Sequence, residues 1–356
     1  MNKILLVNNG YPSKENPTFT TYIKTIKKCL EGSGNKVELL SIFYNKPINK
    51  FIKLEKYSIF WLRCLIINLK KYDVIYINHP TFCFPILFNL TIKKKYIILH
   101  WHGNDLVGKT LFHKIINKII KQKALENINI VPSKYFKSKL ISFLSKKDSK
   151  IFISPSGGVN TNLFKPKELS KIPNTINIGF AAELNINKGA DILEGIIHKK
   201  QIIEKYFGKK VIFNIINYGE KASIYIENYL SFTKDINIWP KMNKEDMPNF
   251  YNSNDMLIFP SKREAESLGL VALEALSCNV PVITFNQFAF PEFIVPKNTG
   301  ELVNFNSSYT TNILNFINMI IKVIENYQSY KPRNLILNKY SEDSVINFYK
   351  KIFNNL

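Results

Sequence analysis

The sequence contains very little arginine, although it is strongly basic. Of its 49 basic residues only Arg63, Arg263 and Arg333 are arginines, so the net charge of +22 is carried by lysines that are spread along the chain. Arginine is the side chain most used for bidentate contacts with phosphates and bases. We therefore expect no nucleic-acid partner, whereas attraction to an anionic membrane surface is a consequence that this charge allows.

Cysteine and long apolar runs are also scarce. The four cysteines show no C-x-x-C spacing, and no signal peptide precedes the first strand-like run at residues 4–7. The most apolar stretches, 57–69 and 82–90, fall short of the roughly 18 to 20 apolar residues that a membrane span needs. The sequence therefore predicts a protein of the reducing cytoplasm, at most peripheral on the inner face of the cell membrane.

Several motifs of metal and cofactor chemistry are absent. The chain has no D-x-D pair, and its cysteines and histidines lack metal-ligand spacing. It has neither a G-x-x-x-x-G-K-[ST] loop nor a G-x-G-x-x-G fingerprint. We therefore expect no metal site, no cofactor, no ATP hydrolysis and no NAD chemistry.

In the first half of the chain, strand-like apolar runs alternate with helical patterns. This alternation predicts a parallel sheet covered by helices, in a first domain of residues 1–165. Residues 165–175 carry two prolines and three lysines and are predicted to be a linker. The predicted strands are 4–7, 36–42, 74–77, 96–99, 128–131 and 151–154, with a turn at 8–12 and an amphipathic helix at 20–30.

The same alternation restarts after the linker and predicts a second α/β domain of residues 176–337. Two open α/β domains in sequence would place a ligand cleft where the carboxyl ends of their strands face one another. The predicted strands are 176–181, 211–217, 256–260 and 280–284, and the predicted helices are 191–198, 270–277 and 311–327.

The segment FPSKREAESLGLVALEALSCNVPVIT, residues 259–284, reads as strand, loop, helix and strand. Glu266 would lie in the loop and Glu274 on the helix. Gly269 would let the backbone approach a ligand closely, and the free N–H groups at the start of the helix could hold phosphate oxygens. Asn279 is suited to a left-handed position after the helix.

This segment resembles the E-x7-E motif of glycosyltransferase family 4, whose members are retaining enzymes of the GT-B fold. The resemblance implies that Glu266 contacts the hydroxyls of the donor sugar and that Glu274 accepts hydrogen bonds from the ribose. The spacing alone would equally suit two solvated carboxylates. Flanking residues agree with the family as well, and those expected to bind the nucleotide-sugar donor are Lys262, Arg263, Ser267, Gly269 and Leu270.

The segment GFAAELNINKG, residues 179–189, resembles the family's strand followed by a loop that ends in Lys-Gly. The resemblance implies that Lys188 contacts the donor diphosphate and acts in catalysis, although a surface lysine is the alternative. Where the family usually has an arginine, this chain has Ala182-Glu183. Either Lys262 or Arg263 replaces that cation, or the enzyme is slow, altered in its donor or inactive.

In the first domain, His100-Trp101-His102-Gly103-Asn104-Asp105 resembles the family's H-G-x-D loop. Matching by the Gly and the Asp selects His102 as the catalytic-site histidine that faces the sugar, and His100 as a strand-end residue that points into the fold. Gly10 is expected on the acceptor side, or serves turn chemistry alone.

The resemblance implies an α/β protein with the GT-B fold: two Rossmann-like, doubly wound domains facing a cleft, with a C-terminal helix, 338–356, that crosses back to the first domain. It implies transfer of a sugar from a UDP- or GDP-linked donor to a hydroxyl of a glycan acceptor, in the cell envelope often lipid-linked, with the leaving phosphate taking the acceptor proton. The alternatives are a sugar-nucleotide epimerase or phosphorylase of the same fold and a degenerate, non-catalytic sugar-nucleotide-binding protein.

Overall fold

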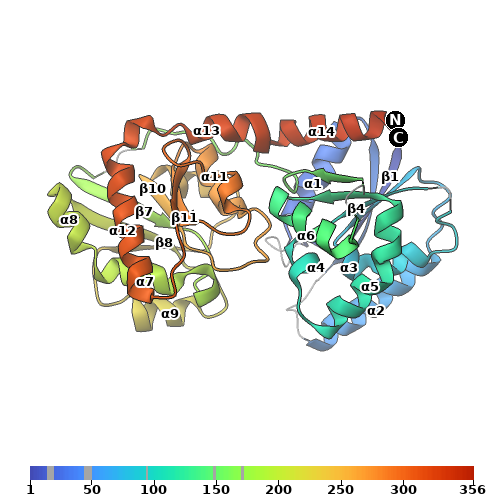
Figure 1. Ribbon diagram of the computed structural model, residues 1–356, viewed down its shortest axis with the longest axis horizontal. Coiled ribbons are helices and arrows are strands. Elements are labelled where there is room, and N and C mark those ends of the chain that lie inside the picture. The colour runs from blue at the N-terminus through green and yellow to red at the C-terminus, as the bar shows by residue number, and fades with distance from the viewer. Residues whose placement is uncertain (14–19, 44–49, 94, 147–149, 170–171) are drawn as a thin grey trace. The chain divides into compact units, whose positions relative to one another are not determined.

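The computed structural model describes residues 1–13, 20–43, 50–93, 95–146, 150–169 and 172–356. The chain divides into two compact units (Figure 1). Unit 1 comprises Met1–Gly158 and Glu342–Leu356, and unit 2 comprises Val159–Ser341.

Unit 1 is built on a parallel sheet, six-stranded over the described residues, in the order β2-β1-β3-β4-β5-β6. The direction of the strand order reverses between β1 and β3, which makes this the topological switch point where ligands of such sheets bind. The strands are β1 (Lys3–Tyr11), β2 (Lys36–Phe43), β3 (Val74–Asn78), β4 (Tyr96–His100), β5 (Ile128–Val131) and β6 (Ile151–Ile153).

Helices cover both faces of this sheet because successive strand residues face opposite sides. Leu5 and Val7 of β1 belong to the apolar core on one face, and Ile4 and Leu6 belong to the core on the other. The helices of unit 1 are α1 (Tyr22–Gly32), α2 (Lys50–Ile66), α3 (Pro80–Cys83), η1 (Phe84–Phe88), α4 (Gly103–Val107), α5 (Leu111–Glu126), α6 (Lys134–Leu144) and α14 (Glu342–Asn354).

The last helix, α14, packs against α1 of unit 1, as Figure 1 shows. Val345 and Tyr349 of α14 are buried in the same core as Ile4 and Leu6. In addition, the Tyr349 hydroxyl lies 2.7 Å from the hydroxyl of Tyr76 on β3. The predicted return of a C-terminal helix to the first domain is confirmed.

Unit 2 repeats the architecture with the strand order β12-β11-β10-β7-β8-β9, again parallel throughout the described residues. Its switch point lies between β7 and β10. The strands are β7 (Thr175–Phe180), β8 (Lys210–Ile216), β9 (Ile236–Trp239), β10 (Met256–Phe259), β11 (Val282–Phe285) and β12 (Gly300–Val303).

The helices of unit 2 again cover both faces of its sheet. Asn279 has φ +64° directly after the C-cap of α11, so the predicted left-handed residue is confirmed. The helices are η2 (Ile186–Lys188), α7 (Ala190–His198), α8 (Gln201–Phe207), α9 (Ala222–Tyr229), α10 (Met247–Asn252), α11 (Leu270–Ser277), η3 (Phe290–Glu292), α12 (Tyr309–Glu325), η4 (Tyr327–Ser329), α13 (Pro332–Leu335) and η5 (Ile336–Tyr340).

One prediction about the chain path needs correction. The predicted turn at 8–12 is wrong, because β1 continues to Tyr11, which pairs with Phe43 after a register shift. The side chains of the two asparagines that suggested a turn form hydrogen bonds at the carboxyl end of β1. Asn8 donates to the Gly10 carbonyl, and Asn9 donates to the Tyr57 hydroxyl.

The division between the units lies at Gly158, ahead of the predicted limit at 165. The reason is that Phe164 is fully buried in the core of unit 2, so the chain has already joined that unit before the polar segment begins. Residues 170 and 171 of the predicted linker lie outside the described residues.

Candidate functional site

At the switch point of unit 2, the loop after β7 and the loop after β10 are joined through their backbones. The Lys262 N–H donates to the Asn187 carbonyl at 2.9 Å. Gly189 has φ +84°, and a Cβ there would lie 2.3 Å from the Pro260 carbonyl oxygen. Only glycine allows this approach, so the loop that carries Lys188 is fixed against the loop that carries Glu266.

Lys188 and Glu266 form an ion pair across these two loops. Their side chains are only 15% and 16% exposed, so water screens the pair weakly. Asn185 positions Lys188 by accepting its backbone N–H at 2.9 Å. The two catalytic residues predicted from separate motifs therefore meet at one point.

Lys262 forms a second cross-loop ion pair, with Asp191 in the first turn of α7, at 2.5 Å. The other Asp191 oxygen, Oδ1, is buried and has no hydrogen-bond partner within the described parts of the chain. The charge of Lys262 is thus balanced by Asp191, and Arg263 lies exposed in the same loop. Lys262 consequently braces the two loops.

The second carboxylate of the motif, Glu274, lies on α11 behind the loop that carries Glu266. The hydroxyl of Tyr251 donates to Glu274 Oε2 at 3.0 Å. Burial raises the pKa of Glu274 to about 7, against the opposing influence of Lys244 and the Tyr251 hydrogen bond. Glu274 therefore changes charge near neutral pH.

The start of α11 is set by Gly269, the N-cap residue, with φ +63°. A Cβ at Gly269 would lie 2.8 Å from the ring of Phe259, which ends β10. Leu270 is the first residue of α11, and Ser267 lies in the preceding loop. The free N–H groups at the helix start lie at the carboxyl edge of the sheet, where they can hold anionic oxygens.

Glu183, one of the pair Ala182-Glu183 that stands where the resemblance implies an arginine, lines a separate polar pocket of 330 Å³. A Cβ on Gly219 would lie 2.7 Å from Glu183 Cγ, so the side chain lies against the loop after β8. Across the pocket, Lys241 Nζ lies 5.6 Å from the centre of the Tyr218 ring. Lys241 thus adds to the pocket that Glu183 lines a cation that the sequence motifs did not indicate.

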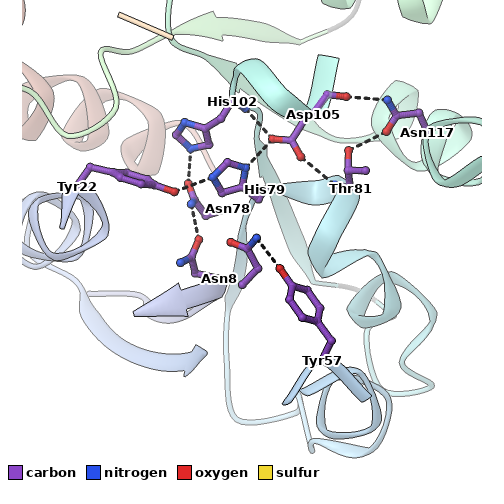
Figure 2. A network of polar contacts seen from close by, with 10 residues as sticks. Asn8, Tyr22, Tyr57, Asn78, His79, Thr81, His102, Asp105 and Asn117 are labelled. Carbon is purple, nitrogen blue, oxygen red and sulfur yellow. Dashed lines mark hydrogen bonds and ion pairs between the residues drawn. The ribbon is translucent and has the colours of Figure 1, made fainter. Parts of the chain in front are cut away.

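In unit 1, a chain of polar contacts links the carboxyl ends of β1, β3 and β4 (Figure 2). Asn8 Nδ2 donates to the Gly10 carbonyl, so Asn8 Oδ1 accepts from Asn78 Nδ2 at 2.5 Å. Asn78 Oδ1 is then left to accept from His102 Nε2 at 2.7 Å. This order of donors fixes the proton of His102 on Nε2.

His102 is a neutral imidazole. Its ring lies 4.4 Å from that of His79 and 4.5 Å from that of His100, centroid to centroid. Burial, together with His79 and His100, holds the pKa of His102 well below its usual range. His102 therefore serves as a hydrogen-bonding group near neutral pH, with its lone pair on Nδ1.

Asp105 anchors this site from a fully buried position. Its Oδ2 accepts from the His102 backbone N–H at 2.9 Å and from His79 Nδ1 at 2.9 Å, and its Oδ1 accepts from the Thr81 N–H at 3.3 Å (Figure 2). The Tyr22 hydroxyl lies 2.6 Å from His79 Nε2. The sequence motifs missed His79, although a histidine between a buried strand and a proline was a usable signal.

His100 points into the fold, as predicted. Its Nδ1 lies 2.8 Å from the Tyr76 hydroxyl, and burial lowers its pKa to about 3. Gly10 is buried on β1, and its carbonyl contributes to the site by accepting from Asn8.

Metal-ligating clusters, disulfides and membrane spans do not occur among the residues that the structure describes. No three His, Cys, Asp or Glu side chains of this set gather in a way that could hold a metal ion. The four cysteines are free and buried. No helix in the described part of the chain has the length and apolarity needed to cross a bilayer.

Comparisons with known proteins show which proteins this chain is similar to. The family model described as glycosyl transferases group 1 matches residues 164–340. A Klebsiella pneumoniae protein described as an uncharacterized 41.2 kDa protein in the cps region is 25% identical over 347 residues, which are 92% of this chain and 87% of that one. The capsular polysaccharide biosynthesis glycosyltransferase CapM of Staphylococcus aureus is 29% identical over 184 residues, 49% of this chain and 47% of that one.

Among solved structures, that of Anabaena HepE in complex with UDP and glucose matches with a TM-score of 0.68 at 16% identity, covering 100% of both chains. At this identity the likeness shows the fold, which is GT-B, as the sequence predicted. The family match, the capsular relative and the two doubly wound units together identify the chain as a glycosyltransferase of the group 1 family, family 4, which uses a nucleotide-sugar donor.

Proposed function

We propose that the enzyme is retaining and transfers a hexose from a UDP- or GDP-sugar to a hydroxyl of a lipid-linked glycan in cell-envelope polysaccharide synthesis. The observation that carries the donor half of the proposal is the ion pair of Lys188 with Glu266 at the switch point of unit 2. The similarity to HepE, solved with UDP and glucose, supports the donor, and the similarity to the capsular enzyme CapM supports the pathway.

In this proposal the donor diphosphate binds between Lys188 and the N-terminus of α11. The phosphate oxygens replace Glu266 as the partner of Lys188, and Glu266 turns to the sugar hydroxyls while Glu274 accepts from the ribose. The bond between the anomeric carbon and the leaving diphosphate breaks, and Lys188 balances the charge that develops. The acceptor oxygen bonds to the same face and its proton passes to the leaving diphosphate, so no side-chain nucleophile is needed.

The acceptor side is proposed to be the polar network of unit 1. His102, neutral and held by Asn78, is the group proposed to contact a sugar hydroxyl. Such a network suits uncharged hydroxyl groups because it contains hydrogen-bonding groups and no lysine. The net positive charge of the chain would attract it to an anionic membrane surface. We therefore propose that the enzyme acts as a peripheral protein at the inner face of the cell membrane.

The test is donor hydrolysis by the purified protein across a panel of UDP- and GDP-linked sugars, read as release of the free nucleotide. One donor should be hydrolysed slowly without acceptor, and NMR of the product should show the retained anomer. Loss of this activity in Lys188→Ala, but not in Lys205→Ala on the exposed side of α8, would support the site. Absence of binding and hydrolysis for every donor would favour the non-catalytic alternative.

Metal independence is a separate expectation. Lys188 and the α11 N-terminus would balance the negative charge of the diphosphate, which Mg²⁺ does in metal-dependent enzymes. Turnover should survive excess EDTA. Loss of turnover in EDTA with rescue by Mg²⁺ or Mn²⁺ would contradict the proposed donor site.

A further inference from the structure

Helix α2 of unit 1 exposes an unusual amount of apolar surface. Phe51 is 83% exposed and Leu54 is 69% exposed, and Leu62 and Ile66 further along the helix are 58% and 70% exposed. A helix of a soluble domain normally buries its apolar side. Large exposed apolar patches mark interaction sites, so α2 is a candidate for one.

Residues of α2 between Phe51 and Trp61 also form one wall of a 410 Å³ pocket. The Trp61 and Phe112 rings are stacked at 6.3 Å, and the Phe82 and Phe112 rings lie 5.8 Å apart. The lining is apolar and aromatic apart from Lys53: Phe51, Leu54, Tyr57, Trp61, Phe82 and Phe112.

The polar atoms of these aromatic residues are already engaged elsewhere. Trp61 Nε1 donates to the Phe82 carbonyl at 2.9 Å, and the Tyr57 hydroxyl accepts from Asn9 Nδ2 at 3.1 Å. The rings therefore present hydrocarbon surface to the pocket. Its occupant should be apolar.

The pocket adjoins the polar network of unit 1 at two points. Tyr57, in its wall, bonds Asn9, which precedes Gly10 and follows Asn8 of the network in the sequence. Phe82, on the other side, has its ring 6.2 Å from that of His79. The wall of the pocket is therefore adjacent to the polar network on the side of His79.

The charge around the pocket is positive. Lys53 lines it, and α2 also carries Lys56 and Arg63 against the single acid Glu55. Helix α5 contains four lysines and one glutamate. This surface suits an amphiphile that joins a hydrocarbon chain to an anionic group.

From the pocket, its continuity with the network and its charge, we infer that it binds the hydrocarbon chain of the acceptor, a glycan joined through phosphate to a lipid. This inference rests on the proposed function, whose acceptor it places. One hydrocarbon chain of the lipid would occupy the pocket, and the surface of a bilayer would not. A bilayer would contact the whole exposed side of α2, including Leu62 and Ile66, which do not line the pocket.

The test is titration with farnesyl phosphate below its aggregation threshold, read by tryptophan fluorescence because Trp61 lines the pocket. Wild type should respond saturably, and inorganic phosphate should give no response. Leu54→Gln should weaken binding about tenfold, since an apolar contact of this size is replaced by an amide. The matched control is Leu62→Gln, exposed on the same helix and outside the pocket, which should bind like wild type.

Equal weakening by both variants would indicate a bilayer-type surface and overturn the inference, as would an equal response to inorganic phosphate. Circular dichroism of both variants verifies that α2 still folds. Donor hydrolysis is measured on the same wild-type protein. If a donor is hydrolysed but farnesyl phosphate does not bind, this inference is overturned and the proposed function is retained. If farnesyl phosphate binds saturably but no donor is hydrolysed, the lipid-binding pocket is retained and the proposed function is overturned.

Discussion

The carboxyl edges of the two sheets have the same architecture and opposite chemistry. In unit 2 two cross-loop ion pairs, Lys188 with Glu266 and Lys262 with Asp191, place full charges at the switch point. In unit 1 the corresponding edge holds amides and a neutral histidine around one buried carboxylate. A charged edge suits a diphosphate donor and a neutral hydrogen-bonding edge suits hydroxyl groups, so the difference supports the proposed division of the two substrates between the units.

Removing the cation of the charged edge should have the largest effect. Lys188→Ala should lower kcat by about 10² to 10³, because Lys188 is proposed to balance the charge that develops on the leaving diphosphate. Steady-state kinetics with the hydrolysed donor measure it, with Lys205→Ala as the exposed control. Wild-type kcat and KM in Lys188→Ala would mean that the charged edge does not hold the diphosphate.

Removing the buried carboxylate of the neutral edge should instead cost stability. Asp105→Ala leaves three donors without their acceptor and should destabilise the protein by about 3 kcal/mol in urea unfolding. Asp73→Ala, where an exposed carboxylate accepts one backbone N–H, should cost about 1 kcal/mol or less. Nucleotide affinity of folded Asp105→Ala should stay at the wild-type value, and a parallel loss of affinity would break the assignment of one substrate to each unit.

Glu274→Ala should weaken binding of the free nucleotide by roughly 1.5 to 3 kcal/mol, through loss of charge-assisted bonds to the ribose. Calorimetric titration measures it. The control is Tyr251→Phe, which removes only the hydroxyl that supports Glu274 and should cost less. Unchanged affinity in a folded Glu274→Ala variant would remove this carboxylate from the donor site.

The smallest expected effect is a pH dependence confined to the charged edge. The pKa of Glu274 is raised to about 7, and the ribose hydroxyls are proposed to donate to its ionised form, so nucleotide affinity should rise about tenfold between pH 6 and pH 8. Between pH 4.5 and 7 the folded state keeps a proton that the unfolded state has lost, so this group's contribution to stability falls as pH rises. Glu274→Gln should flatten both profiles, and an unaltered affinity profile in that variant would assign the titration to another group.

The sequence was most informative where a motif coincides with a strand end. Lys188 and Glu266 are 78 residues apart in the sequence, yet their two motifs predicted that both belong to the donor site. Their side chains form an ion pair in the structure. The central strands were also predictable because they are buried on both faces, as β3 is throughout.

What could not be predicted depended on tertiary context. Strand β9 was missed because it is a short edge strand with two exposed residues, and β12 because it starts at a glycine with φ +158°. Helix α2 was missed because its exposed apolar residues remove the polar face that signals a surface helix. The contact of His79 with Asp105 joins residues 26 apart with no spacing signal.

The assignment of α14 to unit 1 has a consequence for synthesis on the ribosome. Unit 2 is one continuous stretch, whereas the core of unit 1 lacks Val345 and Tyr349 until α14, which follows unit 2 in the chain, has emerged. Domains usually fold in the order in which they are made. Here the domain that is begun first is completed last, and Tyr349, which closes the hydrogen-bonded line through Tyr76 to His100, is among its final residues to leave the exit tunnel.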